Sequence, residues 1–214
     1  MKTSITGPKR IAGNLFTWVV FVTPIVAVTA VVSWPVERGI DQRAGLCADE
    51  RVDQLMFGAS QGDICQVRRV LSKRVDVNRG TDVGLTALMC ASAGPRATAA
   101  ESVRLLIGAG ADVNLADGFG TTPLTYAVMS KNDDAAERLL AAGADPNARN
   151  CRGFTALHAA TLRGYVPPLL QVLLDNGANR DARDDQGKTP LDYAKDDGNT
   201  AAMEVLEAAL AARS

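Results

Sequence analysis

The phrase Gly-x-Thr-x-Leu-x-x-Ala occurs four times in this chain of 214 residues, and it constrains the fold more than any other feature. Its copies begin at Gly84, Gly120, Gly153 and Gly187, at intervals of 36, 33 and 34 residues. A regular period of roughly 20–50 residues is typical of proteins built from stacked units, each of which covers the hydrophobic face of the next. The sequence therefore predicts a stack of similar units.

Each unit also contains a Leu-Leu pair that is followed closely by Gly-Ala-Asp or Gly-Ala-Asn, within 105–114, 139–147 and 173–179. Thr before Pro or Ala favours a helix start, because its hydroxyl caps free N–H groups and Pro fits the first turn. The Leu-Leu pair belongs to a second helix, and we expect Gly110, Gly143 and Gly177 to end it in the left-handed conformation. Each unit should therefore be a helix, a turn, a helix and an extended loop.

This pattern resembles the ankyrin repeat, most directly in the stretch Thr-Ala-Leu-His-Ala-Ala at 155–160. A degenerate first unit precedes the four phrases, and the second unit has about three extra residues within 94–100, expected between its helices. The resemblance implies an all-α ankyrin-repeat solenoid of about five helix-turn-helix units with loop fingers. It also implies a structural role for His158, whose ring should hydrogen-bond the backbone of a neighbouring repeat. The expected repeats are 51–83, 84–119, 120–152, 153–186 and 187–214.

A segment of 24 residues without any charge, 11–34, precedes the repeats. As a helix it would be about 36 Å long, enough for the hydrocarbon core of a bilayer of about 30 Å. Lys2, Lys9 and Arg10 lie before it, and positive charge is retained on the cytoplasmic side. We therefore predict a cytoplasmic N-terminus at 1–10, a transmembrane or signal helix at 11–34, a linker at 35–50 and an exported repeat domain.

Two interpretations of the apolar segment remain open. It is longer than the usual hydrophobic region of a signal peptide and ends at Trp34, which favours a retained anchor in the cytoplasmic (inner) membrane with the repeats in the periplasm. Small residues up to Ala30 would suit cleavage there and secretion to the periplasm. The periplasmic location follows from the resemblance, since exported ankyrin proteins of this kind are mostly bacterial.

The composition disfavours nucleic-acid binding, catalysis and metal binding. There are 23 Lys and Arg against 24 Asp and Glu, which disfavours a nucleic-acid binder. His158 is the single histidine, and no nucleophile with a partner base is apparent, so we predict no enzymatic activity, no metal, no cofactor and no small-molecule substrate. Cys47 and Cys65 flank the expected first helix, and either a disulfide or free thiols would suit an exported protein.

The resemblance implies a protein–protein interaction scaffold that binds its partner through the loop fingers and the concave helix face. We predict an apolar patch in the third and fourth repeats, bordered by charged side chains, as is usual in interfaces. The alternative is that some of these side chains pack on neighbouring loops. The candidate partner-binding residues are Phe119, Met129, Arg152, Phe154, Leu162, Arg163, Asp185 and Lys188.

Two narrower functions stay open beside the general scaffold. The domain could be an immunity or inhibitor protein that blocks a toxic enzyme in the periplasm. It could also be an accessory factor that protects or regulates a partner enzyme, for instance one of the oxidative-stress response. The identity of the partner is not encoded in any motif of the chain.

Overall fold

The computed structural model of this chain describes residues 47–162 and 167–211, which contain helices and loops and no strand. The helices come in five pairs along the chain, as the resemblance predicts. Their bounds are α2 (Cys47–Gln61), α3 (Ile64–Leu71), α4 (Ala87–Ala93), α5 (Arg96–Gly108), α6 (Pro123–Met129), α7 (Asp133–Ala141), α8 (Ala156–Thr161), α9 (Pro167–Asp175), α10 (Pro190–Asp196) and α11 (Thr200–Ala211).

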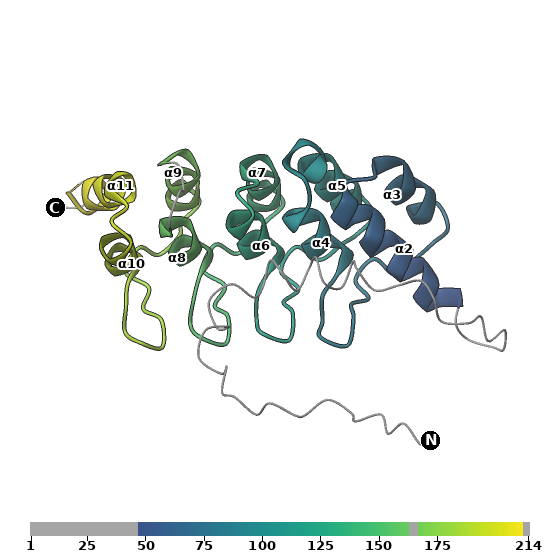
Figure 1. Cartoon of the computed structure of the whole chain (residues 1–214), viewed down its shortest axis with the longest axis horizontal. Helices are drawn as coiled ribbons and strands as arrows, with labels where there is room; N and C mark the ends of the chain where they lie inside the picture. The colour runs from purple at the N-terminus through teal and green to yellow at the C-terminus, as the bar shows by residue number, and fades with distance from the viewer. Residues whose placement is uncertain (1–46, 163–166, 212–214) are drawn as a thin grey trace, which may run out of the picture.

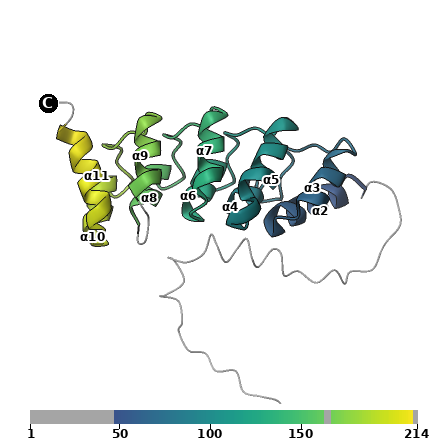
Figure 2. The same cartoon turned by 90° about the horizontal axis from the view of Figure 1, so that it is seen from above.

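The pairs stack side by side into an elongated array with two layers of helices (Figure 1, Figure 2). The two helices of each pair pack on each other, and the first helices α2, α4, α6, α8 and α10 contact one another in an unbroken row. The second helices form the outer layer, and four long loops project from the side of the first helices (Figure 1). The described part of the chain is therefore an all-helical solenoid.

The first helices begin where the repeated threonine predicts. The hydroxyl oxygen of Thr86 accepts the backbone N–H of Met89 at 3.4 Å, and that of Thr189 accepts the N–H of Asp192 at 3.3 Å. Thr122 precedes α6 in the same extended conformation, with proline in the first turn. An extended residue before a helix leaves its side chain free to cap the exposed N–H groups. The predicted positions of the helix starts are confirmed; the predicted hydroxyl cap forms at Thr86 and Thr189, whereas Thr122 accepts no backbone N–H.

The second helices end on glycines in the left-handed conformation. Gly110, Gly143 and Gly177 have φ angles of +90°, +88° and +85°. In the second repeat the N–H of Gly110 donates to the carbonyl of Ile107, and the N–H of Ala111 donates to Leu106, both at 3.0 Å. These bonds satisfy carbonyls at the helix end that have no partner within the helix. The prediction for these three glycines is confirmed.

The core lies between the two layers and is built from the repeated leucines and alanines. Leu124 and Leu157 of the first helices and Leu139 and Leu173 of the second are all fully buried. Ala127 and its equivalents in neighbouring repeats are also buried, and their small side chains let adjacent helices approach closely. Burial of these side chains is the main stabilising contribution available to the array.

A row of asparagines links successive repeats beneath the second helices. The amide of Asn114 donates to the carbonyl of Gly143 at 3.1 Å, and its oxygen accepts the N–H of Asp145 at 2.8 Å. Asn78 and Asn147 make the equivalent pair of bonds to the repeats that follow them. An amide side chain both donates and accepts, so one residue satisfies two backbone groups of the next repeat.

Two details differ from the sequence-based expectation. The extra residues of the second repeat do not form a longer loop between its helices; they lengthen α5, which has 13 residues where α7 and α9 have 9 each. The first helix of the array begins at Cys47 rather than at 51, inside the predicted linker. The added helical residues, 47–50 and 96–100, contain neither proline nor glycine, so nothing in them stops the helix.

The predicted membrane segment 11–34 lies outside the described residues, as do 1–10 and most of the predicted linker. Among the helices of 47–162 and 167–211, none combines the length and the hydropathy that a membrane span needs.

Candidate functional site

The four projecting loops have the same five-residue turn at their ends, and we call these turns the fingers: 81–85, 117–121, 150–154 and 184–188. In each, the backbone N–H of the first residue donates to the carbonyl of the fifth, as from Asp117 to Thr121 at 3.0 Å. The side-chain oxygen of the first residue accepts the N–H of the fifth, at 2.8 Å for the same pair. The fourth residue is glycine with a positive φ, +77° at Gly120. Local polar bonds thus fix the shape of every finger.

Neighbouring fingers are also bonded to each other. The carbonyl of Val83 accepts the N–H of Gly118 at 2.8 Å, and the carbonyl of Phe119 accepts the N–H of Cys151 at 2.8 Å. The carbonyl of Arg152 accepts the N–H of Asp185 at 2.9 Å. One backbone bond between each pair keeps the fingers side by side, so side chains on different repeats form one continuous surface.

The third residue of each finger is its tip. The tips of the first two fingers are apolar and exposed, with Val83 at 53% and Phe119 at 61%. The tips of the last two are polar, Arg152 and Gln186, and both are exposed. The row of fingertips therefore changes from apolar to polar along the array. An apolar surface beside charged groups is the usual composition of a binding interface.

Two fingers are tied to the helix that follows them by a tyrosine–aspartate hydrogen bond. The hydroxyl of Tyr126 donates to Asp117 at 2.8 Å, and the hydroxyl of Tyr193 donates to Asp184 at 2.6 Å. Burial and the adjacent carboxylate raise the pKa of Tyr193 to about 12, and both causes raise that of Tyr126 as well. Both phenols therefore stay protonated and act as donors at neutral pH.

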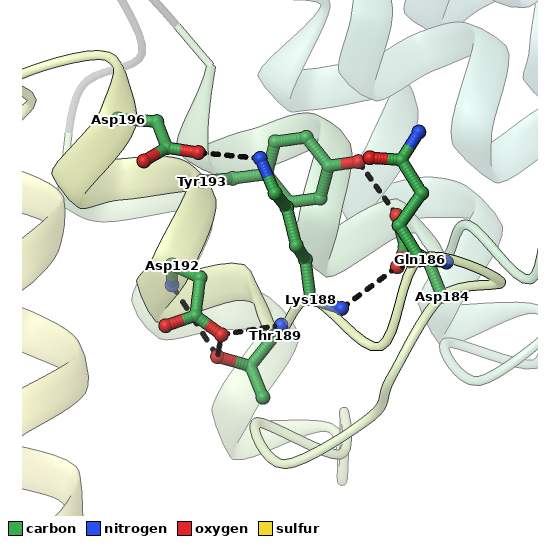
Figure 3. Close-up of polar contacts among 7 residues, drawn as sticks. All are labelled: Asp184, Gln186, Lys188, Thr189, Asp192, Tyr193 and Asp196. Atoms are coloured by element: carbon green, nitrogen blue, oxygen red, sulfur yellow. Dashed lines mark hydrogen bonds and ion pairs between the residues drawn. The ribbon is translucent and has the colours of Figure 1, made fainter.

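Figure 3 shows the polar contacts of the last finger with α10. Lys188 donates its ammonium to Asp196 of α10 at 2.7 Å and lies 5.4 Å from the centre of the Tyr193 ring. The bond to Asp196 raises the pKa of Lys188. The amide and hydroxyl of Thr189 both donate to Asp192, at 2.9 and 2.7 Å, which lowers the pKa of that carboxyl. These bonds hold the finger against α10.

His158 has the structural role that the resemblance implies. It is fully buried; its Nδ1 accepts the N–H of Thr155 at 3.2 Å, and its Nε2 lies 3.2 Å from the carbonyl of Lys188 in the next repeat. Because Nδ1 accepts a backbone N–H, the proton of the neutral ring is on Nε2, which donates to Lys188. Desolvation by burial is the main reason that the pKa of His158 is lowered. The predicted hydrogen bond to a neighbouring repeat is confirmed.

Phe154 differs from its prediction as a member of an exposed patch. It is half-buried and packs against the core, with its ring centre 5.1 Å from that of His158 and 5.4 Å from that of Tyr193. It is the fifth residue of its finger, and that position points back toward the helices, whereas the tip points outward. The alternative stated for the patch is packing on neighbouring loops, whereas this ring packs on helix residues, His158 in α8 of its own repeat and Tyr193 in α10 of the next.

The remaining predicted residues are divided among three places. Phe119, Arg152 and Asp185 are exposed in three adjacent fingers that the backbone bonds hold together. Met129 and Leu162 lie at the ends of α6 and α8 and are half-buried. Lys188 is in the last finger and is already paired with Asp196, and Arg163 lies outside the described residues.

Two exposed apolar residues were not included in the predicted patch, Val83 at the first fingertip and Phe57 on α2, which is 48% exposed. The signal for Val83 is its register: like Phe119 and Arg152, it directly precedes the glycine that opens the repeated phrase. Phe57 has no such signal, because the first repeat lacks the phrase.

The described residues contain no group of three or more His, Cys, Asp or Glu side chains that could hold a metal ion. Cys65 and Cys151 are exposed free thiols, so Cys65 follows the free-thiol alternative in this structure. Cys90 is buried, and desolvation raises the pKa of its thiol to about 12. A thiol with so high a pKa is a poor nucleophile.

Comparison with known proteins assigns the family. The family model of ankyrin repeats (3 copies) matches residues 55–150 and 137–209. Mitochondrial disaggregase of Bos taurus is 35% identical over 151 residues, which are 66% of this chain and 21% of that protein. The Neurogenic locus Notch protein of Drosophila melanogaster is 31% identical over 181 residues, 72% of this chain and 7% of that protein.

A third relative is matched over nearly its whole length. Cyclin-dependent kinase 4 inhibitor B of Rattus norvegicus is 36% identical over 131 residues, which are 61% of this chain and 95% of that protein. The disaggregase and Notch, by contrast, are proteins of which this chain spans only a small part. The chain belongs to the ankyrin repeat family.

Proposed function

We propose that this chain is an interaction scaffold that binds a partner protein through its fingertips and the adjacent ends of the first helices. The observation that supports this most is the exposure of Val83 and Phe119 at neighbouring tips that a backbone hydrogen bond holds in place. Large apolar side chains on a rigid support lose little conformational entropy on binding. Arg152 and Asp185, on the following fingers, would border the apolar contact with charge.

Replacing Phe119 with alanine tests this surface. Phe119 is 61% exposed, so its truncation should leave the melting temperature close to that of the wild type. Truncating a side chain at the centre of an interface commonly costs about 2 kcal/mol or more, which corresponds to a loss of affinity of roughly 30-fold. The measurement is capture of partners from a membrane extract by the wild type, followed by titration of the variant against the captured protein.

Phe154 provides the matched comparison. Because its ring packs on His158 and Tyr193, Phe154→Ala should lower the melting temperature, and any loss of capture should accompany that loss of stability. Normal capture by folded Phe119→Ala protein would show that the partner uses another face of the array.

A narrower proposal is that the partner is an enzyme and that binding inhibits it. The similarity to cyclin-dependent kinase 4 inhibitor B, over 95% of that protein, supports it, since that protein is by name an inhibitor and consists almost entirely of the matched repeats. A captured enzyme whose activity falls in a 1:1 mixture with this chain would support inhibition. Unchanged or increased activity would favour the accessory role instead.

We also propose that residues 11–34 place the repeats at a membrane, with the N-terminus in the cytoplasm and the repeats exported to the periplasm. The support is the uncharged sequence itself, with Lys2, Lys9 and Arg10 before it. A phosphatase that is active only after export, fused after residue 50, should be active in a bacterial host. An inactive fusion would contradict the export of the repeats, and the N-terminal sequence of the mature protein would separate an anchor from a signal cleaved after Ala30.

A further inference from the structure

The outer surface of the first repeat carries a cluster of exposed basic side chains. Arg68 and Arg69 lie in α3, and Lys73 and Arg74 lie in the turn that follows it. No acidic residue occurs between 64 and 75. We call these four side chains the basic face. These four basic side chains fall within seven consecutive residues, and the repulsion among them favours a bound anionic surface.

One carboxylate from the neighbouring repeat partly compensates this charge. Glu101 of α5 accepts Arg68 at 2.9 Å and two bonds from Arg104, both at 2.7 Å. The bond from Arg104 is the main cause that lowers the pKa of Glu101 to about 2. Glu101 is therefore shared by two guanidinium groups, and it leaves Arg69, Lys73 and Arg74 uncompensated by any ion pair of the described residues.

The helix α3, which contains Arg68 and Arg69, belongs to the layer of second helices, on the side of the array away from the fingers (Figure 1). Arg104 of α5 and Arg138 of α7 continue it, because they hold the same register as Arg69, directly before an apolar pair. In α9 and α11 that register holds Val172 and Val205. Positive charge is thus concentrated at the N-terminal end of the outer layer.

We propose that the basic face binds the anionic phospholipid headgroups of the membrane leaflet that the repeat domain faces. The proposal rests on the membrane segment proposed above: 34 and 47 are separated by 12 residues, which reach at most about 43 Å when extended. The first repeat is therefore the one tethered closest to the bilayer, and exposed Lys and Arg are attracted electrostatically to an anionic surface on whichever side of the membrane it lies. The fingers, on the opposite side, would then face away from the membrane and remain open to a partner.

Cys65 makes the contact measurable. It is an exposed thiol in α3, three and four residues before Arg68 and Arg69, so the three side chains share one face of the helix. Cys151 is an exposed thiol on the third finger and serves as an internal reference. Cys90 is buried with a thiol pKa of about 12 and should not react. Replacing Cys47 with serine leaves these two reactive sites.

The full-length Cys47→Ser protein is reconstituted into vesicles of phosphatidylcholine alone or of phosphatidylcholine with phosphatidylglycerol, and both thiols are labelled with a membrane-impermeant maleimide. In the anionic vesicles, labelling of Cys65 relative to Cys151 should slow about fivefold or more, and high salt should abolish the difference. In the variant Arg68→Gln, Arg69→Gln, Lys73→Gln, the two lipids should give equal ratios. The matched variant Arg149→Gln, Arg183→Gln, Lys195→Gln removes three exposed charges elsewhere and should keep the protection.

Equal labelling ratios of the wild type in both lipids would overturn the proposal, as would protection that persists without the three charges. Protection of Cys65 by a short duplex DNA, with none by anionic vesicles, would also overturn it in favour of a nucleic acid. If residues 11–34 do not insert into a bilayer, the protein will not float with neutral vesicles, and this result is distinct from a failure of the basic face. Flotation with anionic vesicles alone, reversed by salt and lost in the three-charge variant, would then support the basic face by itself.

Discussion

The burial and the hydrogen bonds of His158 determine which ring nitrogen carries the proton and how the side chain responds to pH. Its neutral ring accepts an N–H from its own repeat and donates to a carbonyl of the next. A proton on Nδ1 would break the first bond and leave a charge in a fully buried position. The same side chain could not serve as a proton carrier without disturbing the contact between two repeats, which agrees with a structural role.

The stability of the array should therefore fall in mildly acidic solution because of His158. Its pKa is lowered below the usual 6.5 on folding, so between the two values the unfolded chain binds more protons than the folded chain. The contribution of His158 to stability is complete above pH 6.5 and is lost as the pH falls from 6.5 to the lowered pKa of the folded state. Urea unfolding at pH 8, 7, 6 and 5 measures the loss.

His158→Thr is the control for this prediction, because Thr125 occupies the same register in the third repeat. The variant should be less stable at pH 8 and should show no step near the histidine pKa. Carboxylates such as Asp192, with their lowered pKa values, act only in more acidic solution. An identical step in the variant and the wild type would assign the pH response to another group.

At the scale of the helix, two glycines in one turn have opposite effects on stability. Gly108 is the last residue of α5, and Gly110 lies two residues later with a φ of +90°. A Cβ atom at either position would have no other atom within 4 Å, so sterics with neighbours contribute nothing. Only the backbone conformation distinguishes them.

Gly108→Ala should stabilise the protein by about 0.5–1 kcal/mol, because alanine restricts the unfolded chain and suits the helix. Gly110→Ala should destabilise it by about 1–2 kcal/mol, because an L-residue is disfavoured in the left-handed region. Thermal unfolding of the two variants beside the wild type gives both signs. A shift of the same sign in both would show that the helix end can rearrange.

At the scale of the whole molecule, the cost of truncating a core side chain depends on the position of its repeat in the linear stack as well as on its burial. Leu124 and Leu206 are both buried, at 0% and 1% exposed. Leu124 lies in α6, which packs on α4, α7 and α8, whereas Leu206 lies in α11, which packs on α9 and α10 at the end of the array. In such a stack, stability is approximately the sum of each unit and its interfaces with its neighbours.

Leu124→Ala should therefore cost about 2–5 kcal/mol in unfolding free energy and affect the entire array. Leu206→Ala should cost less, because the last repeat can unfold while the others stay folded. Hydrogen exchange of the amides separates the two cases: the first variant should lose protection throughout, the second mainly in 190–211. Equal losses of protection along the whole chain in both variants would contradict a linear stack.

The repeated unit could be predicted from the amino-acid sequence, because the determinants of that unit are local. The repeated threonine marks the start of the helix that follows it, and a glycine in the left-handed conformation ends the helix that precedes it. The spacing of leucine and alanine creates the apolar face of the helix that contains them. The period then fixed how units follow one another. The family, the helix layers and the role of His158 could all be predicted from these residues.

Which loop and helix-end side chains are available for binding depends on how the repeats pack on one another. Phe119 and Phe154 lie in equivalent loops, one directly before and the other directly after the finger glycine, and one is 61% exposed whereas the other packs on His158 and Tyr193. Tyr193 belongs to the next repeat, 39 residues further along the chain, so its contact with Phe154 became visible only in the folded array. Likewise, Arg68 and Arg69 are on an exposed face of α3 because the opposite face of that helix, with Val67 and Val70, packs into the core.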